Sequence, residues 1–102
     1  MFIQRITLSP ALGKNRELRM LVEENIKQGQ AQGRQASLTT PVMGDDMGSV
    51  VITVRHNDLA ELEKTRAHNA SDKAWQEYVG KVSAIATAKF ELFEVLIPFP
   101  TK

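Results

Sequence analysis

The sequence contains no cysteine, which excludes a disulfide framework and thiolate chemistry. Aromatic residues make up only 6% of the chain, and no apolar run approaches the roughly 20 residues that a membrane-spanning helix requires. The first residues also lack the basic start and long apolar stretch of a signal peptide. Neither sign of charge is in excess, since 13 Lys and Arg oppose 12 Asp and Glu. Such a balance disfavours non-specific attraction to nucleic acid or anionic lipid. We therefore expect a cytoplasmic protein with no nucleic-acid partner and no membrane partner.

The 102 residues have the composition of a small folded domain, with 42% hydrophobic and 25% charged residues. A chain of this length buries only about two-thirds of the surface that it exposes when unfolded, so it gains considerably from a partner. We expect a single domain over residues 1–98, followed by a short C-terminal tail at residues 99–102.

The stretch 49–55, Ser-Val-Val-Ile-Thr-Val-Arg, is β-branched and almost continuously apolar. This composition is typical of a strand in the middle of a sheet, covered on both faces. Further strands are predicted at residues 2–8, 35–42 and 90–97, and the second of these should form an antiparallel hairpin with 49–55. The prolines at positions 41 and 98 lack an N–H donor, which favours edge positions for their strands.

Helical periodicity predicts a helix from about residue 14 to the glycines near 29–33. Asp58 followed by Glu61 resembles a capping box and predicts a second helix start. This helix is expected to break at Asn69 or Ser71, with Ser71 capping a further helix. The apolar stripe of that further helix comprises Trp75, Tyr78, Val79, Val82, Ile85 and Ala86.

The order strand, helix, two strands, helix pair, strand predicts an α+β fold of the ferredoxin-like βαββαβ type. Right-handed crossovers place the first and third strands at the centre of an antiparallel sheet, with helices on one face. The other face is predicted to carry apolar side chains that a single copy leaves in water: Ile3, Val51, Phe90, Leu92 and Leu96. Because large exposed apolar patches mark interfaces, we predict a homodimer in which two sheets pack face to face.

Residues 72–78, Asp-Lys-Ala-Trp-Gln-Glu-Tyr, precede an amphipathic helix and a final strand. This pattern resembles the dimeric α+β barrel proteins and is most similar to their NIPSNAP-like group, in which an acidic residue precedes Trp and a second aromatic follows three residues later. The opening strand, Arg-Ile-Thr-Leu at 5–8 before Pro10, also resembles that group. The resemblance implies a dimer whose two sheets enclose a cavity. Related barrels include cofactor-free monooxygenases, muconolactone-type isomerases and haem-degrading enzymes, whereas many members of the group have no established reaction.

Four polar residues are predicted to share the sheet face inside such a barrel: Arg5, Thr53, Arg55 and Glu94. Two guanidinium groups and a carboxylate would there orient an acidic or carbonyl-bearing small molecule in an otherwise apolar cavity. The alternative is an Arg–Glu pair that is satisfied across the strands or across the dimer interface. Trp75 and Tyr78 would either line a cavity for an aromatic ligand or, at their helical spacing, form part of the core.

We expect neither a metal nor a cofactor. The histidines, His56 and His68, lie twelve residues apart without a third ligand, and His68 is expected to be exposed. The glycines at 44 and 48 connect two strands, unlike a phosphate-binding loop. The functions left open are a barrel that binds a small molecule, a cofactor-independent monooxygenase or isomerase, a non-catalytic dimerisation or interaction module, and a ligand-sensing regulatory domain.

Overall fold

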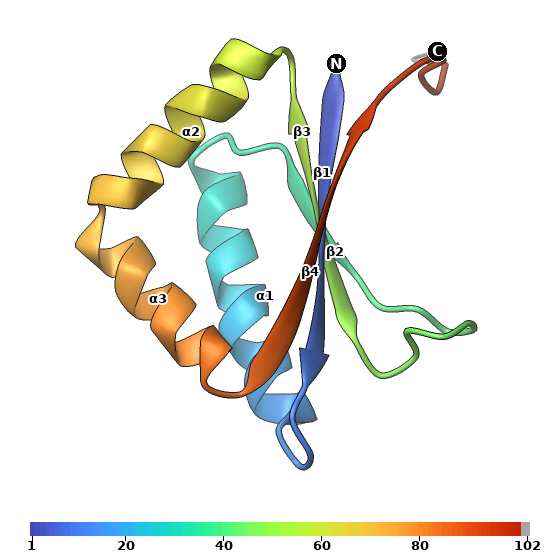
Figure 1. Cartoon of the computed structure of the whole chain (residues 1–102), viewed down its shortest axis with the longest axis vertical. Helices are drawn as coiled ribbons and strands as arrows, with labels where there is room; N and C mark the ends of the chain where they lie inside the picture. The colour runs from blue at the N-terminus through green and yellow to red at the C-terminus, as the bar shows by residue number, and fades with distance from the viewer. Residues whose placement is uncertain (101–102) are drawn as a thin grey trace.

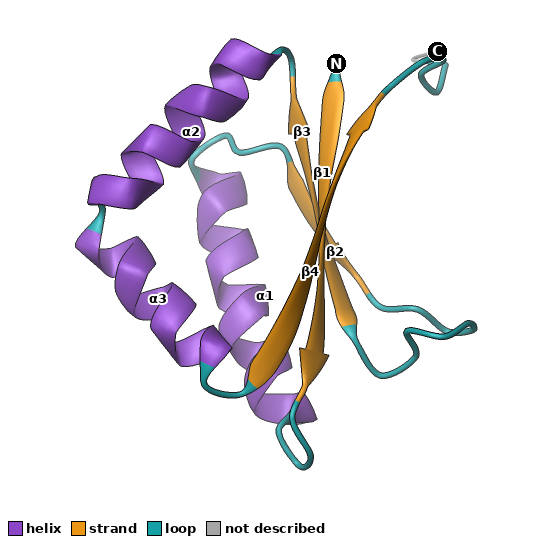
Figure 2. Cartoon of the chain, in the orientation of Figure 1, coloured by secondary structure: helices purple, strands orange, loops and turns teal. Residues whose placement is uncertain are grey.

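In the computed structural model, which describes residues 1–100, four strands and three helices follow the predicted order (Figure 1). The strands are β1 (Phe2–Pro10), β2 (Ala36–Thr39), β3 (Val50–His56) and β4 (Ala86–Glu94). The helices are α1 (Asn15–Ala31), α2 (Leu59–Ser71) and α3 (Lys73–Ser83). Figure 2 shows the helices as a layer on one side of the sheet, which confirms the predicted ferredoxin-like α+β fold.

The sheet has the order β2-β3-β1-β4, and each neighbouring pair is antiparallel. β3 therefore lies inside the sheet, as its β-branched sequence predicts, and the second and fourth strands form the edges. β1 pairs with β4 over its whole length, from Phe2 opposite Glu94 to Pro10 opposite Ala86. β2 is shorter than predicted because it ends before Pro41, which has no N–H to contribute to a ladder.

The core lies between the sheet and the helices. Helix α1 buries Leu18, Val22 and Ile26 at helical spacing. They pack against inward residues of the sheet and the end of α3: Leu8, Ala36, Val50, Ile52, Val82 and Ile85. Helix α1 ends at the predicted glycines, where Gly33 adopts a φ of +90° and donates its N–H to the carbonyl of Gln30 at 3.0 Å. Glycine reaches this backbone conformation without the steric cost of a side chain.

Two aspartates determine where α2 and α3 begin. Asp58 accepts a 2.8 Å hydrogen bond from the backbone N–H of Glu61, as predicted. The predicted cap of α3 is wrong by one residue, because Asp72 rather than Ser71 accepts hydrogen bonds from the first turn, at 3.0 and 3.4 Å. Ser71 remains in α2, where its hydroxyl donates to a carbonyl of that helix at 3.1 Å. A carboxylate thus fulfils the role that the sequence assigned to the neighbouring hydroxyl.

β4 differs most from its prediction. It begins at Ala86 instead of Phe90 and ends at Glu94 instead of Ile97. The earlier start follows from its pairing with all of β1, because a shorter strand would leave the last backbone groups of β1 without ladder partners.

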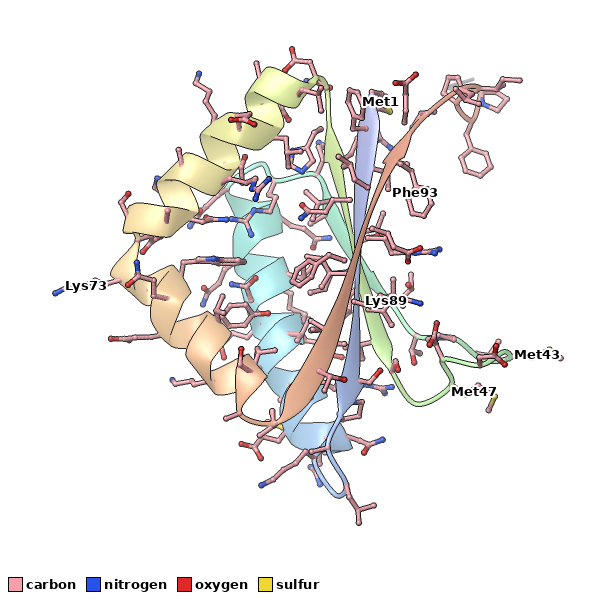
Figure 3. All side chains as sticks on the ribbon, viewed as in Figure 1. Met1, Met43, Met47, Lys73, Lys89 and Phe93 are labelled. Atoms are coloured by element: carbon pink, nitrogen blue, oxygen red, sulfur yellow. The ribbon has the colours of Figure 1, made fainter. Side chains whose placement is uncertain are left out.

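The register of β4 also reverses the faces predicted for its side chains. Phe90 lies opposite Ile6 and Leu92 opposite Gln4, so both side chains point to the helix side of the sheet. Leu96 lies beyond the strand. The prediction that these three residues cover the open face, the face without helices, is therefore wrong. The open face receives Lys89, Glu91 and Phe93 from β4, and Figure 3 shows Lys89 and Phe93 pointing away from the helices.

Two segments extend past the sheet on its open side, the β2–β3 loop (residues 40–49) and the segment after β4 (residues 95–100) (Figure 1). Both carry strongly exposed apolar side chains: Val42, Met43, Met47, Leu96, Ile97 and Phe99. We call them the two arms. Of the tail predicted at residues 99–102, residues 101 and 102 lie outside the described part of the chain, and the domain boundary at residue 98 stays a prediction.

Candidate functional site

A cavity of about 210 Å³ lies between the sheet and the helices. We call it the inner cavity; its walls include Ile6, Val54, Leu62, Tyr78, Val82 and Phe90. Phe90 faces the helix side from the edge strand β4 and is 67% exposed. The chain thus has an apolar hollow on the covered side of its sheet, where small-molecule sites commonly form.

Tyr78 is the most unusual residue on the wall of the inner cavity. Its hydroxyl is buried and has no hydrogen-bond partner among residues 1–100. Burial raises the pKa of Tyr78 from its ordinary value of 10.0 to about 12, and the nearby Arg34 guanidinium acts in the opposite direction. The ring of Trp75 lies beside it, with ring centroids 5.4 Å apart. A buried hydroxyl without a partner is costly, and native structures seldom keep one unless it has a use.

Arg34 brings a positive charge to the same wall from the turn between α1 and β2. Its backbone N–H donates to the carbonyl of Gly29 at 2.8 Å, and its guanidinium carbon lies 5.9 Å from the centroid of the Trp75 ring. At Gly29, a Cβ atom would lie only 3.2 Å from Cδ of Arg34, so the glycine makes room for the arginine stem. In the sequence, the only indication that another segment packs closely against α1 is Gly29, a glycine at a buried position of the helix.

The wall of the inner cavity also contains a buried histidine. His56 is 3% exposed, its Nε2 lies 3.4 Å from Oε1 of Gln4, and its Nδ1 lies 4.0 Å from a carboxylate oxygen of Glu61. His56 is the last residue of β3, just before the start of α2. His68, in contrast, is exposed as predicted and lies 3.6 Å from a carboxylate oxygen of Asp72.

A second hollow, of about 360 Å³, lies on the solvent side of Arg34 and is more polar. Its walls carry charges of both signs: Glu24, Asp72 and Glu77 together with Arg34 and Lys81. Asp72 already caps α3, and Glu24 accepts a hydrogen bond from Gln28 at 3.4 Å. This outer hollow shares Arg34, Trp75 and Tyr78 with the inner cavity, so these three side chains lie between a polar surface hollow and a mainly apolar interior.

The open face brings together three of the predicted site residues. Arg5 pairs directly with Thr53 across β1 and β3, and Ile3 pairs with Arg55 on the same face. Glu94 does not join them, because it lies opposite Phe2 and faces the helix side. Its predicted position is therefore wrong.

Glu91 occupies the place that the sequence assigned to Glu94. It accepts hydrogen bonds from Nε and Nη2 of Arg5 at 3.1 and 2.9 Å. The Arg5 guanidinium also lies 4.9 Å from the ring centroid of Phe93. The arginine–glutamate pair across strands, one of the two predicted alternatives, thus forms with a different glutamate, and it satisfies Arg5 without a ligand.

Sequence reasoning named Tyr78 and considered His56 only as a possible metal ligand, and it did not name Arg34 or Gln4, which line the same cavity. No group of three or more metal-ligating side chains occurs within residues 1–100. No helix in that range combines the length and apolarity needed to cross a lipid bilayer. The described residues offer a mainly apolar cavity with a few polar groups, and an open face on which the Arg5–Glu91 pair and Phe93 lie between two apolar arms.

The NIPSNAP family model matches residues 4–101 of the chain. A search of curated proteins found no match. A NIPSNAP family protein from Agrobacterium tumefaciens has a similar structure, with a TM-score of 0.75, 18% identity, and 100% of this chain and 100% of that chain covered.

Two further solved structures share the fold. A NIPSNAP-like domain protein from Burkholderia xenovorans gives a TM-score of 0.77 at 18% identity, covering 97% of this chain and 89% of that chain. SnoaB, a cofactor-independent oxygenase from Streptomyces nogalater, gives a TM-score of 0.70 at 15% identity, with 97% of each chain covered. At such identities the likeness shows the fold.

Proposed function

The chain belongs to the NIPSNAP family, and we propose that it binds a small, mainly apolar molecule in the inner cavity. The observation that carries this proposal is the buried hydroxyl of Tyr78, which lacks a partner in residues 1–100 and lies on a mainly apolar wall. A few polar groups in an apolar hollow are the usual composition of a ligand site. The cavity predicted between two sheets requires a second copy and stays a prediction. The inner cavity lies on the opposite side of the sheet, within one chain.

Filling the inner cavity tests this proposal. Val79 lies on α3, lines the cavity and is 41% exposed, so a larger side chain has room to enter without unfolding the protein. We expect Val79→Phe to weaken binding of small apolar compounds about tenfold, because an overpacked site loses on the order of 1.4 kcal/mol. Leu12→Phe adds the same ring on a fully exposed loop and should leave binding unchanged. Binding is measured by calorimetry and by the fluorescence of Trp75, the single tryptophan. Equal affinities for the two variants and the wild type would contradict the proposal.

We also propose that two copies associate through the open side of the sheet. The apolar side chains of the two arms support this proposal, since Met43 is 83% exposed and Ile97 is 89% exposed. Burying such surface in a dimer gains roughly 25 cal/mol per Å². The sheet between the arms contributes the Arg5–Glu91 pair and Phe93, which is 41% exposed, so most of the exposed apolar side chains come from the arms. Light scattering after gel filtration should give a dimer for the wild type and a monomer for Met43→Asp combined with Ile97→Asp. A wild-type monomer at micromolar concentration would refute the dimer.

A cofactor-independent monooxygenase or isomerase is the alternative function, and it would use the same inner cavity. SnoaB is a cofactor-independent oxygenase of the same fold, which motivates the test but does not transfer the activity. Oxygen uptake, and conversion of a bound compound followed by chromatography, distinguish catalysis from binding. A non-catalytic interaction module is favoured if no apolar compound binds while the dimer forms.

A further inference from the structure

Within residues 1–100, two hydrogen-bond donors on the wall of the inner cavity have no anionic partner. The Tyr78 hydroxyl is buried without a hydrogen-bond partner there, and the Arg34 guanidinium forms no ion pair with a carboxylate of the same range. Arg34 is half-buried and carries five N–H donors but no acceptor. Its neighbour Trp75 offers only a ring face, which attracts a cation without accepting its hydrogen bonds individually. Both donors therefore call for the same kind of group, an acceptor with negative charge.

The described residues hold the guanidinium in place, and no carboxylate among them forms an ion pair with it. The backbone of Arg34 is fixed to Gly29, the stem crosses α1 where the glycine leaves room, and the head lies over Trp75. Hydrogen bonds from a guanidinium to a carboxylate are shorter and roughly twice as strong as neutral ones. A carboxylate also has two oxygens, so one can accept from Arg34 while the other accepts from Tyr78. A neutral carbonyl would satisfy both donors less well.

The surroundings also limit the rest of the ligand. The inner cavity is apolar and measures about 210 Å³, compared with the cavity of about 150 Å³ that admits a benzene molecule. A second negative charge on the ligand would lie against the mainly apolar wall of the inner cavity, which is unfavourable. A single carboxylate on a compact apolar body fits best.

We infer that the ligand is a monocarboxylate with a compact aromatic or aliphatic body, whose carboxylate lies between Arg34 and Tyr78. This inference rests on the proposed function, because it names the chemical class of the molecule that occupies the inner cavity. The carboxylate accepts hydrogen bonds from both side chains, and the apolar body packs against residues of the sheet and of α3.

Calorimetry with phenylacetate and its neutral analogue phenylacetamide tests the inference, with Trp75 fluorescence as a local readout. We expect the wild type to bind phenylacetate about tenfold or more tightly than phenylacetamide, as a charge-assisted pair predicts. Arg34→Gln should abolish this preference while keeping the weaker binding of the amide. Arg19→Gln removes the same charge from an exposed position on α1 and should preserve the preference. Octanoate against octanamide repeats the comparison with an aliphatic body.

Equal affinity of the wild type for acid and amide, with both body types, would overturn the inference and leave the proposed function intact. A preference for the acid that persists in Arg34→Gln would overturn it as well, because the charge would then act elsewhere. If no apolar compound binds the wild type at all, the proposed function itself fails. The comparison of acid with amide needs no variant, so a folding defect in Arg34→Gln does not remove the test.

Discussion

Replacing Tyr78 by Phe should make the ligand-free protein more stable. The substitution removes a hydroxyl that is buried and unpartnered within residues 1–100, and it keeps the ring that packs beside Trp75. Leaving such a donor unsatisfied costs about 1–3 kcal/mol, so we expect Tyr78→Phe to raise the free energy of unfolding at pH 7 by about 1 kcal/mol. For a domain of this size that gain corresponds to roughly 4–8 °C in Tm.

The pH dependence gives this prediction a second, independent signature. Because burial raises the pKa of Tyr78 to about 12, the folded protein retains the phenolic proton after the unfolded chain has lost it. Below pH 10.0 both states are protonated and the hydroxyl causes no pH dependence. Between pH 10.0 and about 12 the unfolded chain ionises first, which lowers the wild-type unfolding free energy by about 1.4 kcal/mol per pH unit. The stability gap between Tyr78→Phe and wild type should therefore widen over this range.

The assay is urea unfolding of both proteins at pH 7, 9 and 11. The m value, which is the slope of the unfolding free energy against urea concentration, should be equal for the two proteins if their denatured states are alike. Affinity for phenylacetate is measured in parallel, and the same variant should bind it several-fold more weakly because one of two donors is gone. Destabilisation by Tyr78→Phe at pH 7 would refute the reasoning, because it would mean that the hydroxyl is satisfied in the folded protein. A gap that stays constant from pH 9 to 11 would refute the raised pKa.

The remaining predictions concern three other positions. Gly29→Ala should stabilise α1 by up to about 1 kcal/mol through helix propensity, yet it should weaken phenylacetate binding because the new Cβ displaces the stem of Arg34. Thermal unfolding measures the change in stability and calorimetry measures the change in affinity. Unchanged phenylacetate affinity would count against a role of Arg34 in binding. Asp58→Ala removes the carboxylate that accepts a hydrogen bond from the N–H of Glu61, so it should lower the free energy of unfolding by about 1 kcal/mol. Asp58→Asn retains an acceptor and should lower it little. Equal losses in Tm for the two variants would contradict the capping role. Arg55→Leu alters the open face, whereas the inner cavity lies on the helix side of the sheet, so calorimetry should show unchanged affinity for phenylacetate. Loss of binding in this variant would instead indicate a ligand site on the open face, between two sheets.

Much of the fold could be predicted because it depends on local signals. The switch between alternating and helical periodicity located the strands and helices, and the β-branched run of β3 indicated a central strand. Asp58 with Glu61 marked the start of α2 correctly, since a capping box lies within one helical turn. The short motif around Trp75 and Tyr78 indicated the family, which the family model confirms over residues 4–101.

The faces of β4 could not be predicted in the same way. A strand with apolar residues at both parities, such as Phe90 and Phe93, gives no alternation from which to choose its inward face. Its pairing with β1 decides the matter, and because side chains alternate along a strand, that register fixes every residue at once. The predicted partner of Arg5 therefore changed from Glu94 to Glu91.

The sequence by itself determined the order of the elements, the central position of β3 and the presence of Tyr78 on the inner stripe of α3. Only the tertiary structure decided that Arg34, far away along the chain, lies over Trp75 beside that tyrosine. Local propensities act over a few residues, whereas a binding site depends on contacts between segments that packing brings together. Gly29 connects the two levels, because a missing side chain in α1 allows the arginine to reach the wall of the inner cavity.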